Sequence, residues 1–307
     1  MIRSLCFAFL LATSSLHSVL AEAGDPLAAI RARQLYLDGH PDLAFATLLR
    51  LAQTGDPQAE VALGYFYAKG IGTPVDDAKA VELFERAAQK NHPAAIYNLA
   101  VSYEFGGTGL PRDRAKAEAL YRRSAALDHA PSMHRLALMY LAGKAVPRDI
   151  GLGRALLERA VLSGHPQATA DLAQLLFTGG DLPKDLPRAR ALFLIAAAHG
   201  IDKAQRNYGA MLAAGQGGPA DPAEAEIWLR RAQAAGNATA GLDLAHLLAA
   251  NDSPGPDRQV EALAWCLWYD ASLPVVIPED PSRNCIWART GLTPEDVQKA
   301  IAMAKTF

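Results

Sequence analysis

The sequence predicts an all-α fold built as an α-solenoid of stacked antiparallel helix pairs. The first observation is composition: 61 of the 307 residues are Ala, whereas Val and Ile together number 22. Because Ala favours helices and β-branched side chains favour strands, this balance indicates helices throughout. The second observation is an internal repeat with a period near 36 residues, which is typical of stacked helix pairs.

Composition and charge also exclude several classes of protein. Half of the residues are hydrophobic and 20% are charged, which excludes intrinsic disorder for most of the chain. A formal net charge of −2 lacks the basic excess expected of a nucleic-acid-binding protein. Three Cys in a chain of this length exclude a disulfide-rich scaffold and an array of zinc sites.

Residues 1–21 are predicted to be a signal peptide. Arg3 supplies a positive charge, and the apolar run over residues 5–13 is too short to span a bilayer. Small or apolar residues lead to Ala21, and Glu22 follows the expected cleavage site. We therefore expect an exported protein, periplasmic or secreted, whose mature chain begins near Glu22. The alternatives are a buried N-terminal helix or a membrane anchor.

Residues 22–55 are expected to form a shortened, degenerate copy of the repeat. The terminal copies of a solenoid have a neighbour on one side only, and they are usually atypical in sequence. We therefore expect this segment to be a capping helix pair.

Six copies of the repeat are predicted over residues 56–272. Each copy contains an apolar or aromatic residue followed by a small one, at Leu63-Gly64, Leu99-Ala100, Leu136-Ala137, Leu172-Ala173, Tyr208-Gly209 and Leu244-Ala245. A turn residue follows at Gly70, Gly106, Gly143, Gly179, Gly215 and Asn251. An acidic residue then recurs at Asp76, Asp113, Asp149, Asp185, Asp221 and Asp257. Composition alone does not produce six copies in register.

Each copy is expected to contain two helices, A and B. In the second copy Ile96, Leu99, Ala100 and Tyr103 have the i, i+3, i+4, i+7 spacing of one buried helical face. The turn glycine ends helix A because it adopts a positive φ, and the recurring Asp caps helix B. The small residue in the middle of helix A allows helix B to approach closely. Since one helix pair cannot bury its own apolar face, the copies must stack.

This pattern resembles the Sel1-like repeat family, a longer relative of the tetratricopeptide repeat. The best copy reads Ala59, Leu63-Gly64, Tyr67, Gly70, Asp76, Lys79-Ala80 and Ala87-Ala88. The resemblance covers residues 56–272 and implies a right-handed superhelical solenoid in which the A helices line the concave groove. One secreted branch of the family carries paired Cys in every repeat. This sequence does not, so no activity of that branch is carried over to it.

The last segment, residues 273–307, is predicted to be an irregular stretch followed by a capping helix. Thr293 and Pro294 form a strong helix start, with the acidic residues of the first turn directly after them. Cys266 and Cys285 remain after cleavage of the signal peptide, and we expect a disulfide between them. The alternative is two buried thiols that never meet.

Recognisable catalytic chemistry is missing from the sequence. It contains no G-x-S-x-G elbow, P-loop or H-E-x-x-H motif, and the glycine-rich stretches 106–109 and 215–218 fall in turns between helices. His92, His129 and His165 recur at the start of successive copies. Adjacent helices pack 8–10 Å apart, too far for these imidazoles to share one ion. The sequence therefore predicts no catalytic residues, no metal site, no cofactor and no enzymatic activity.

A polar column on the A helices is the most informative feature for function. It places one residue per repeat on the face turned away from the core: Asn98, Arg135, Asp171, Asn207 and Asp243. One turn further along the same face stand Ser102, Met139, Leu175, Met211 and Leu247. Polar side chains bond the backbone of an extended peptide, and Met and Leu accept its side chains. The alternative is that the apolar row packs between neighbouring A helices and the polar row is only solvated.

The expected function is therefore that of a periplasmic adaptor or regulator of an envelope process. It would bind a protein or peptide partner through the concave groove, without nucleic acid and without stable membrane insertion. The alternatives are a hydrolase that acts on the cell wall and a polysaccharide-binding protein. For the polysaccharide-binding protein, the Trp-rich C-terminal end would be the place to look.

Overall fold

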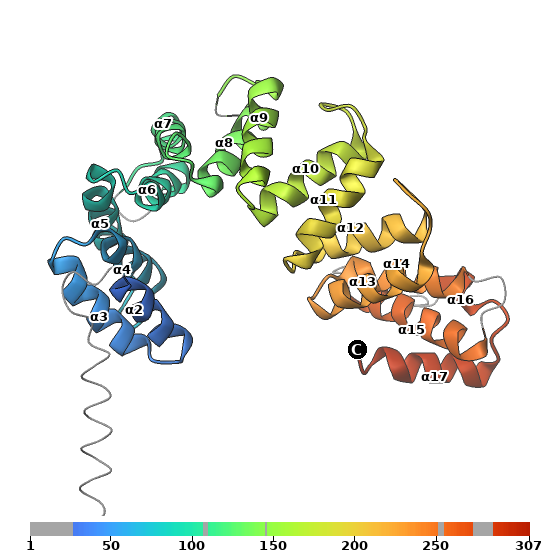
Figure 1. Ribbon diagram of the computed structural model, residues 1–307. Helices are drawn as coiled ribbons and strands as arrows, with labels where there is room; N and C mark the ends of the chain where they lie inside the picture. Colours follow the sequence, from blue (N-terminus) through green and yellow to red (C-terminus); the bar gives the residue numbers. More distant parts are fainter. Residues whose placement is uncertain (1–26, 107–109, 145, 251–254, 273–284) are drawn as a thin grey trace, which may run out of the picture. The chain divides into compact units, whose positions relative to one another are not determined.

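The computed structural model describes residues 27–106, 110–144, 146–250, 255–272 and 285–307 (Figure 1). The predicted signal peptide, Asn251 and most of the irregular C-terminal stretch lie outside these residues. The chain divides into two compact units, residues 1–159 and 160–307, and each unit is described by itself.

The first unit is a series of antiparallel helices in which each packs on its neighbours in the chain. Its helices are α2 (Ala28–Leu37), α3 (Pro41–Gln53), α4 (Pro57–Lys69), α5 (Asp77–Gln89), α6 (Pro93–Phe105), α7 (Arg114–Ala125) and α8 (Ala130–Ala142). Helix α9 (Ile150–Leu162) crosses into the second unit. The segment expected to cap the solenoid corresponds to α2 and α3, which pack together.

The second unit continues the same pattern. Its helices are α10 (Pro166–Thr178), α11 (Leu186–Ala198), α12 (Asp202–Ala213), α13 (Pro222–Ala234), α14 (Ala238–Ala249), α15 (Pro256–Ser272), α16 (Ile286–Arg289) and α17 (Pro294–Ala304). Even-numbered helices from α4 to α14 are the A helices, and α5 to α15 are the B helices. The predicted all-α solenoid class of consecutive helix pairs is confirmed.

Recurring aspartates start the B helices, as the sequence predicts. The Asp76 side chain accepts a hydrogen bond from the backbone N–H of Lys79 at 3.0 Å, and Asp113, Asp185 and Asp221 cap α7, α11 and α13 in the same way. This backbone hydrogen bond lowers the pKa of Asp76 because it favours the charged carboxylate. The sixth residue of the series differs: α15 begins at Pro256, so Asp257 lies within the first turn.

Glycine has two distinct uses in these repeats. Gly70 ends α4 in the left-handed conformation, with φ of 68°. Gly64 lies where α4 meets α5, and a Cβ atom there would be 2.6 Å from a ring carbon of Phe84. The small residue in the middle of this A helix is therefore required by the close approach of the B helix.

Arginines on the B helices connect successive pairs of the first unit. The Arg86 guanidinium on α5 donates to the Ala52 carbonyl at the end of α3, at 3.1 Å. Arg123 on α7 donates in the same way to Ala88 at the end of α5, at 2.7 Å. Each arginine therefore stabilises the C-terminal turn of the second helix of the preceding pair, where carbonyl groups lack helical partners.

The C-terminal end is closed by aromatic packing. Trp265 on α15 is buried, and its ring stacks on Phe307 with 3.6 Å between centroids. Helix α17 packs on α15 and begins where the sequence predicts, with Thr293 and Asp296 forming a capping box. In the described part of the chain, no helix is both long enough and apolar enough to cross a membrane.

Candidate partner-binding groove

The first unit carries an open groove on the exposed side of its first A helices. We call it the tyrosine groove; its volume is about 460 Å³, and it is lined by Arg33, Tyr36, Leu37, Gln58, Val61, Ala62, Tyr65, Phe66, Ala94 and Asn98. These residues come from α2, α4 and α6. Tyr36 and Tyr65 are 39% and 47% exposed, although Tyr is a side chain that buries readily at interfaces.

The helical period explains why these side chains point outward. Ala59, Leu63 and Phe66 on α4 face the core and are buried. Tyr65 lies on the far side of the helix and is exposed, and the partly buried Ala62 lies between Tyr65 and the core face. The Tyr36 ring packs edge to face against the buried Phe66 ring, at 5.5 Å between centroids. The groove therefore presents aromatic side chains that are partly ordered before any partner arrives.

A second, smaller hollow lies on the other side of α6. We call it the basic hollow; its volume is about 190 Å³, and it is lined by Glu104, Arg114, Arg135, Leu138, Met139, Ala142 and Lys144. The Arg135 guanidinium lies 5.5 Å from the centre of the Phe105 ring, and Phe105 is 57% exposed. Partial burial of Arg135 opposes its charge, but a hydrogen bond with Tyr97 and the nearby Glu104 outweigh it and raise its pKa.

Glu104, the acidic residue of the basic hollow, already has a partner. The Tyr121 hydroxyl donates to its carboxylate at 2.7 Å. Burial of Tyr121, reinforced by this hydrogen bond, raises the pKa of the phenol well above its usual range. The phenol therefore stays protonated and keeps donating, and the carboxylate is oriented by a fixed donor.

The polar column has different surroundings in the two units. Asn98 lines the tyrosine groove, and Arg135 and Met139 line the basic hollow. In the second unit the Arg206 guanidinium donates to Asp243 at 2.6 Å, and the Asn207 amide donates to Gln174 at 3.0 Å. Both of these contacts join neighbouring A helices.

Further members of the column are engaged within their own helices. The Gln167 amide donates to Asp171 at 3.4 Å on α10, and the Ser102 hydroxyl donates to the Asn98 carbonyl at 3.0 Å on α6. In the second unit the column therefore makes contacts both within an A helix and between neighbouring A helices.

Met211, one of the expected partner-binding residues, is buried in the structure. Its side chain is 1% exposed. Helix α12, which carries it, also contacts α14, the next A helix. At this position the apolar row packs inside the solenoid, and the residue contributes to the core.

Sequence reasoning missed the aromatic and basic residues of the groove. Tyr36 and Arg33 lie in the degenerate cap, where no repeat alignment indicates which face is exposed. The sequence could have pointed to Tyr65, because it lies three residues after Ala62, which occupies the polar-column position in the first copy. Its later equivalents are Val101, Leu138, Gln174, Ala210 and His246, so no repeated signal marks the position.

A buried ion pair in α4 was also missed. Glu60 is fully buried, and its carboxylate lies 2.8 Å from Arg86 and 2.9 Å from Lys90. Later copies hold Ile96, Met133, Thr169, Gln205 and Gly241 at this position. A lone acid in a mostly apolar series, opposite two cations on the partner helix, is the signal that identifies it.

The three recurring histidines stand at helix starts, where His129 and His165 make contacts within their own helices and His92 contacts the preceding A helix. His92 Nε2 lies 2.9 Å from the Gln58 amide oxygen, and His129 Nδ1 lies 2.9 Å from the Ser132 hydroxyl. His165 Nδ1 accepts from the backbone N–H three residues later, at 3.1 Å. Burial lowers the pKa of His92, with the charge of Asp56 opposing the effect.

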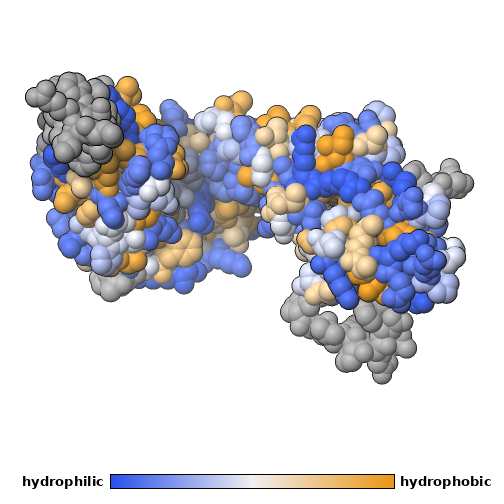
Figure 2. Space-filling model, turned by 90° about the horizontal axis from the view of Figure 1, so that it is seen from below, coloured by the Kyte–Doolittle hydropathy of each residue, from blue (hydrophilic) through white to orange (hydrophobic). Residues whose placement is uncertain are grey.

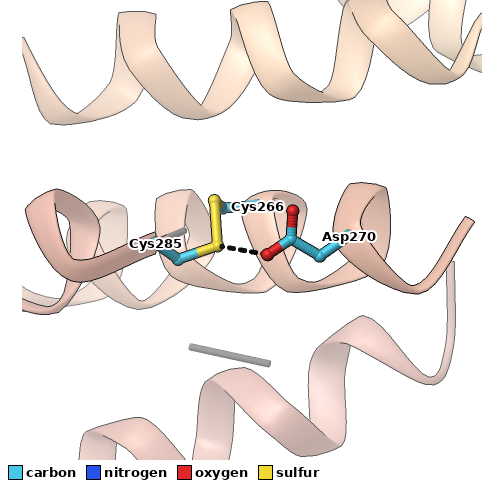
Figure 3. Close-up of side chains that lie close together, drawn as sticks. All are labelled: Cys266, Asp270 and Cys285. Atoms are coloured by element: carbon cyan, nitrogen blue, oxygen red, sulfur yellow. Dashed lines mark hydrogen bonds between the residues drawn. A yellow bond between two sulfur atoms is a disulfide. The ribbon is translucent and has the colours of Figure 1, made fainter. Parts of the chain in front are cut away.

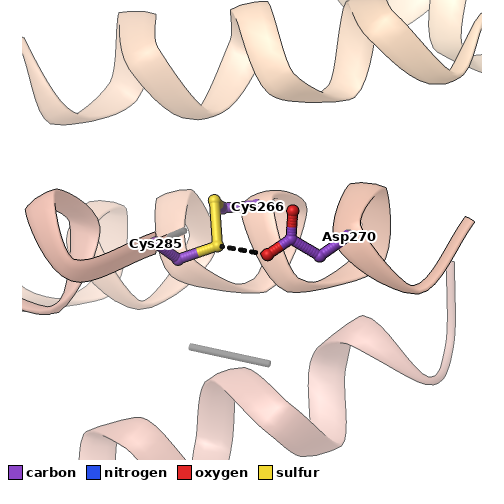
Figure 4. Close-up of a disulfide and its surroundings, with 3 residues drawn as sticks. All are labelled: Cys266, Asp270 and Cys285. Carbon is purple, nitrogen blue, oxygen red and sulfur yellow. Dashed lines mark hydrogen bonds between the residues drawn. A yellow bond between two sulfur atoms is a disulfide. The ribbon is translucent and has the colours of Figure 1, made fainter. Parts of the chain in front are cut away.

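Cys266 and Cys285 form a disulfide in the structure, with Sγ atoms 2.08 Å apart and Cα atoms 5.8 Å apart. Both side chains are buried, and Asp270 Oδ2 lies 3.5 Å from Cys285 Sγ (Figure 3). The three residues are close enough to surround a metal ion. Because the sulfur atoms are bonded to each other (Figure 4), they are not thiolate ligands in this state.

Hydrophobic side chains also occur elsewhere on the surface, interspersed among hydrophilic ones in the view of Figure 2. Trp287 at the C-terminal end is 36% exposed and stacks on His246 at 4.3 Å between ring centroids. The other Trp residues of this end, Trp265 and Trp268, contact each other edge to face. The Trp-rich end is therefore engaged largely in its own packing.

Comparison with known proteins identifies repeats that the sequence pattern predicts. The Sel1 repeat family model matches residues 57–92, 93–129, 130–165, 166–201 and 202–237. A Sel1 repeat protein from Oxalobacter formigenes has a similar solved structure, with 22% identity and a TM-score of 0.61 over 89% of this chain and 96% of that one. No curated protein sequence matches this chain.

A second solved structure also shares the fold. It is a protective antigen present in uropathogenic Escherichia coli strains that displays an SLR fold. Its identity to this chain is 23% and its TM-score is 0.74, over 91% of this chain and 60% of that one. At such identities the likeness concerns the fold.

Proposed function

The chain belongs to the Sel1 repeat family, and we propose that it is an exported scaffold that binds protein or peptide partners through the tyrosine groove. In this proposal it acts as an adaptor or regulator of a process in the cell envelope. It binds its partner and does not transform it chemically.

The observation that carries this proposal is the pair of half-exposed tyrosines in one groove. Tyr and Arg are over-represented among the residues that dominate binding energy at protein interfaces. The tyrosine groove combines Tyr36 and Tyr65 with Arg33, and the amides of Gln58 and Asn98 stand along the same lining. Apolar surface for side chains and polar groups for a peptide backbone are the two needs of an extended ligand.

Export is supported by two independent features. The N-terminal sequence has the charge, apolar run and small residues of a signal peptide. The pairing of Cys266 with Cys285 suits a protein that folds outside the reducing cytoplasm. N-terminal sequencing of the native protein should find a chain that begins at or near Glu22. An intact Met1 on the folded cellular protein would contradict export by this route.

The binding proposal is tested by capture with groove variants. The mature protein is immobilised and exposed to envelope extract, and bound proteins are quantified by mass spectrometry. Tyr65→Ala should lower the recovery of the specific partner at least about tenfold, as truncation of an interface anchor does. Tyr36→Ala should act in the same direction.

Ile227→Ala is the matched control. Ile227 is 52% exposed on α13, so its truncation removes a comparable apolar surface far from the groove in sequence. Partner recovery with this variant should equal that of the native protein. If both tyrosine variants retain every partner, the tyrosine groove is not the binding site.

A further inference from the structure

We propose that the grooved face of the first unit selects a protein segment in which carboxylates accompany apolar side chains. This inference rests on the proposed function and adds the chemistry of the partner. The apolar side chains occupy the tyrosine groove, and a carboxylate binds in the basic hollow.

The charges of the basic hollow favour an anionic ligand. Arg114, Arg135 and Lys144 face a single acidic residue, Glu104, among its lining residues. The Glu104 carboxylate already accepts the Tyr121 hydroxyl, and it offsets one of the three positive charges. Arginine binds carboxylates through two parallel N–H···O bonds, which gives such a site both affinity and orientation.

The tyrosine groove has the complementary composition. Tyr36, Leu37 and Tyr65 supply exposed apolar surface, and Arg33 is the charged residue among its lining residues. An acidic residue next to an apolar one therefore meets a cation in either hollow. A basic segment would meet a cation in both, and the placement of like charges against each other is costly.

The two hollows are close enough for one segment to reach both. They flank α6: Asn98 on this helix lines the tyrosine groove, and Glu104 lines the basic hollow. These residues are six positions apart, which is about 9 Å along a helix, and the width of α6 adds about 10 Å across it. An extended chain covers the resulting distance of about 13 Å with about four residues, so an apolar residue and an acidic one about four positions apart are sufficient.

The corresponding surface of the second unit differs in its charge balance. There the guanidinium of Arg206 is paired with Asp243, and both side chains belong to neighbouring A helices. In the first unit, by contrast, three cations of the basic hollow face one acidic residue, and the exposed tyrosines lie on the neighbouring helices. We therefore assign the selectivity to the face formed by α2, α4 and α6, by α8 with the turn that follows it, and by the start of α7.

Three fluorescent peptides of about twelve residues, long enough to extend past both hollows, test the proposal. The first alternates Asp or Glu with Leu or Phe, the second carries Asn and Gln in place of the acids, and the third carries Lys. Binding to the mature protein is followed by fluorescence anisotropy. We expect the acidic peptide to bind at least about tenfold more tightly than the amide peptide. The Lys peptide should bind most weakly, and added salt should weaken the acidic peptide alone.

Charge reversals locate the effect. Arg114→Glu and Lys144→Glu change exposed side chains, so both variants should keep the circular dichroism spectrum of the native protein. Each should weaken the acidic peptide about tenfold and leave the amide peptide unchanged. Lys203→Glu, an exposed reversal on the A helix α12, is the control and should change neither.

The failure of this inference is distinct from the failure of the proposed function. If Tyr65→Ala abolishes the binding of peptides or partners but the charge of the peptide makes no difference, the groove binds without the selectivity proposed. If the amide or Lys peptide binds as tightly as the acidic one, the inference is overturned. If Tyr65→Ala and Tyr36→Ala affect no ligand, the proposed function is overturned together with it.

Discussion

The carboxylate of Glu60, fully buried in α4, lies 2.9 Å from the ammonium group of Lys90, which follows the end of α5. Lys90 also donates to the Gly55 carbonyl at 2.6 Å, and Arg86 contacts the carboxylate from the same helix. Both cations remain about two-fifths exposed. The buried carboxylate of Glu60 is therefore compensated by two cations, Arg86 and Lys90, that both remain in contact with water.

This asymmetry predicts opposite results from the two ways of breaking the cluster. Removal of both cations, by Arg86→Met with Lys90→Met, should cost about 3 kcal/mol because it leaves an uncompensated buried carboxylate. Glu60→Met should change the free energy of unfolding by less than about 1 kcal/mol, or raise it, because the cations return to water. Urea unfolding followed by circular dichroism provides the comparison. Equal losses for the two variants would contradict it.

A second prediction concerns pH. Burial holds the pKa of His92 below its ordinary value of 6.5, so the unfolded chain takes up this proton at a higher pH than the folded one. The stability that neutral His92 contributes is present above pH 6.5 and is lost as the pH falls through its lowered folded-state pKa. His92→Gln should therefore lose less stability than the native protein between about pH 7.5 and 5.

If the native protein and the His92→Gln variant lost the same stability over that pH range, protonation of His92 would not be the cause of the loss. The His199→Gln variant is the control. Its imidazole is exposed at the end of α11, so its pH profile should follow that of the native chain.

Adjacent residues of α8 should separate folding from binding. Leu136 is buried in the core and Arg135 is only half-buried. Leu136→Ala should lower the free energy of unfolding by about 2–5 kcal/mol because it leaves a cavity. Arg135→Ala should cost no more than about 1 kcal/mol and should weaken the acidic peptide. Thermal and urea unfolding, with anisotropy on the same samples, measure both effects. If Arg135→Ala lowered the free energy of unfolding more than Leu136→Ala does, Arg135 would be a residue of the fold and not of the binding surface.

The disulfide gives a further prediction. Cys266 and Cys285 are separated by 19 positions, and closure of a loop of this size restricts the unfolded chain. The Cys266→Ser, Cys285→Ser variant should be less stable than the native protein by about 3 kcal/mol. Alkylation of the exported protein without reductant, followed by mass spectrometry, should find neither thiol free. Labelling of both cysteines before reduction would show that the pair is not bonded.

Periodicity predicted the helices well because each repeat imposes the same local physics. Asp76 caps α5 and Gly70 ends α4 as expected, since capping and positive φ depend only on a few adjacent residues. The close packing of α5 on Gly64 follows from the same register. These features can be predicted without knowing how the repeats pack against one another.

The binding face was only partly predictable, for a different physical reason. The period of a helix shows which residues share a side, but it does not show which neighbouring helix covers that side. Met139 and Met211 occupy equivalent positions, yet Met139 lines the basic hollow and Met211 is buried. Tyr36 belongs to a segment without a usable alignment. Its exposure depends on tertiary packing against Phe66.

The arginines that join successive B helices have a mechanical consequence. Arg86 and Arg123 each connect one helix pair to the carbonyl end of the pair before it. A pulling force along the stack would load these bonds one after another, because each pair contacts mainly its neighbours. Each pair that detaches would release about 36 residues, or about 12 nm of extended chain. Under tension this part of the protein would therefore lengthen in discrete steps, each the length of one unfolded repeat.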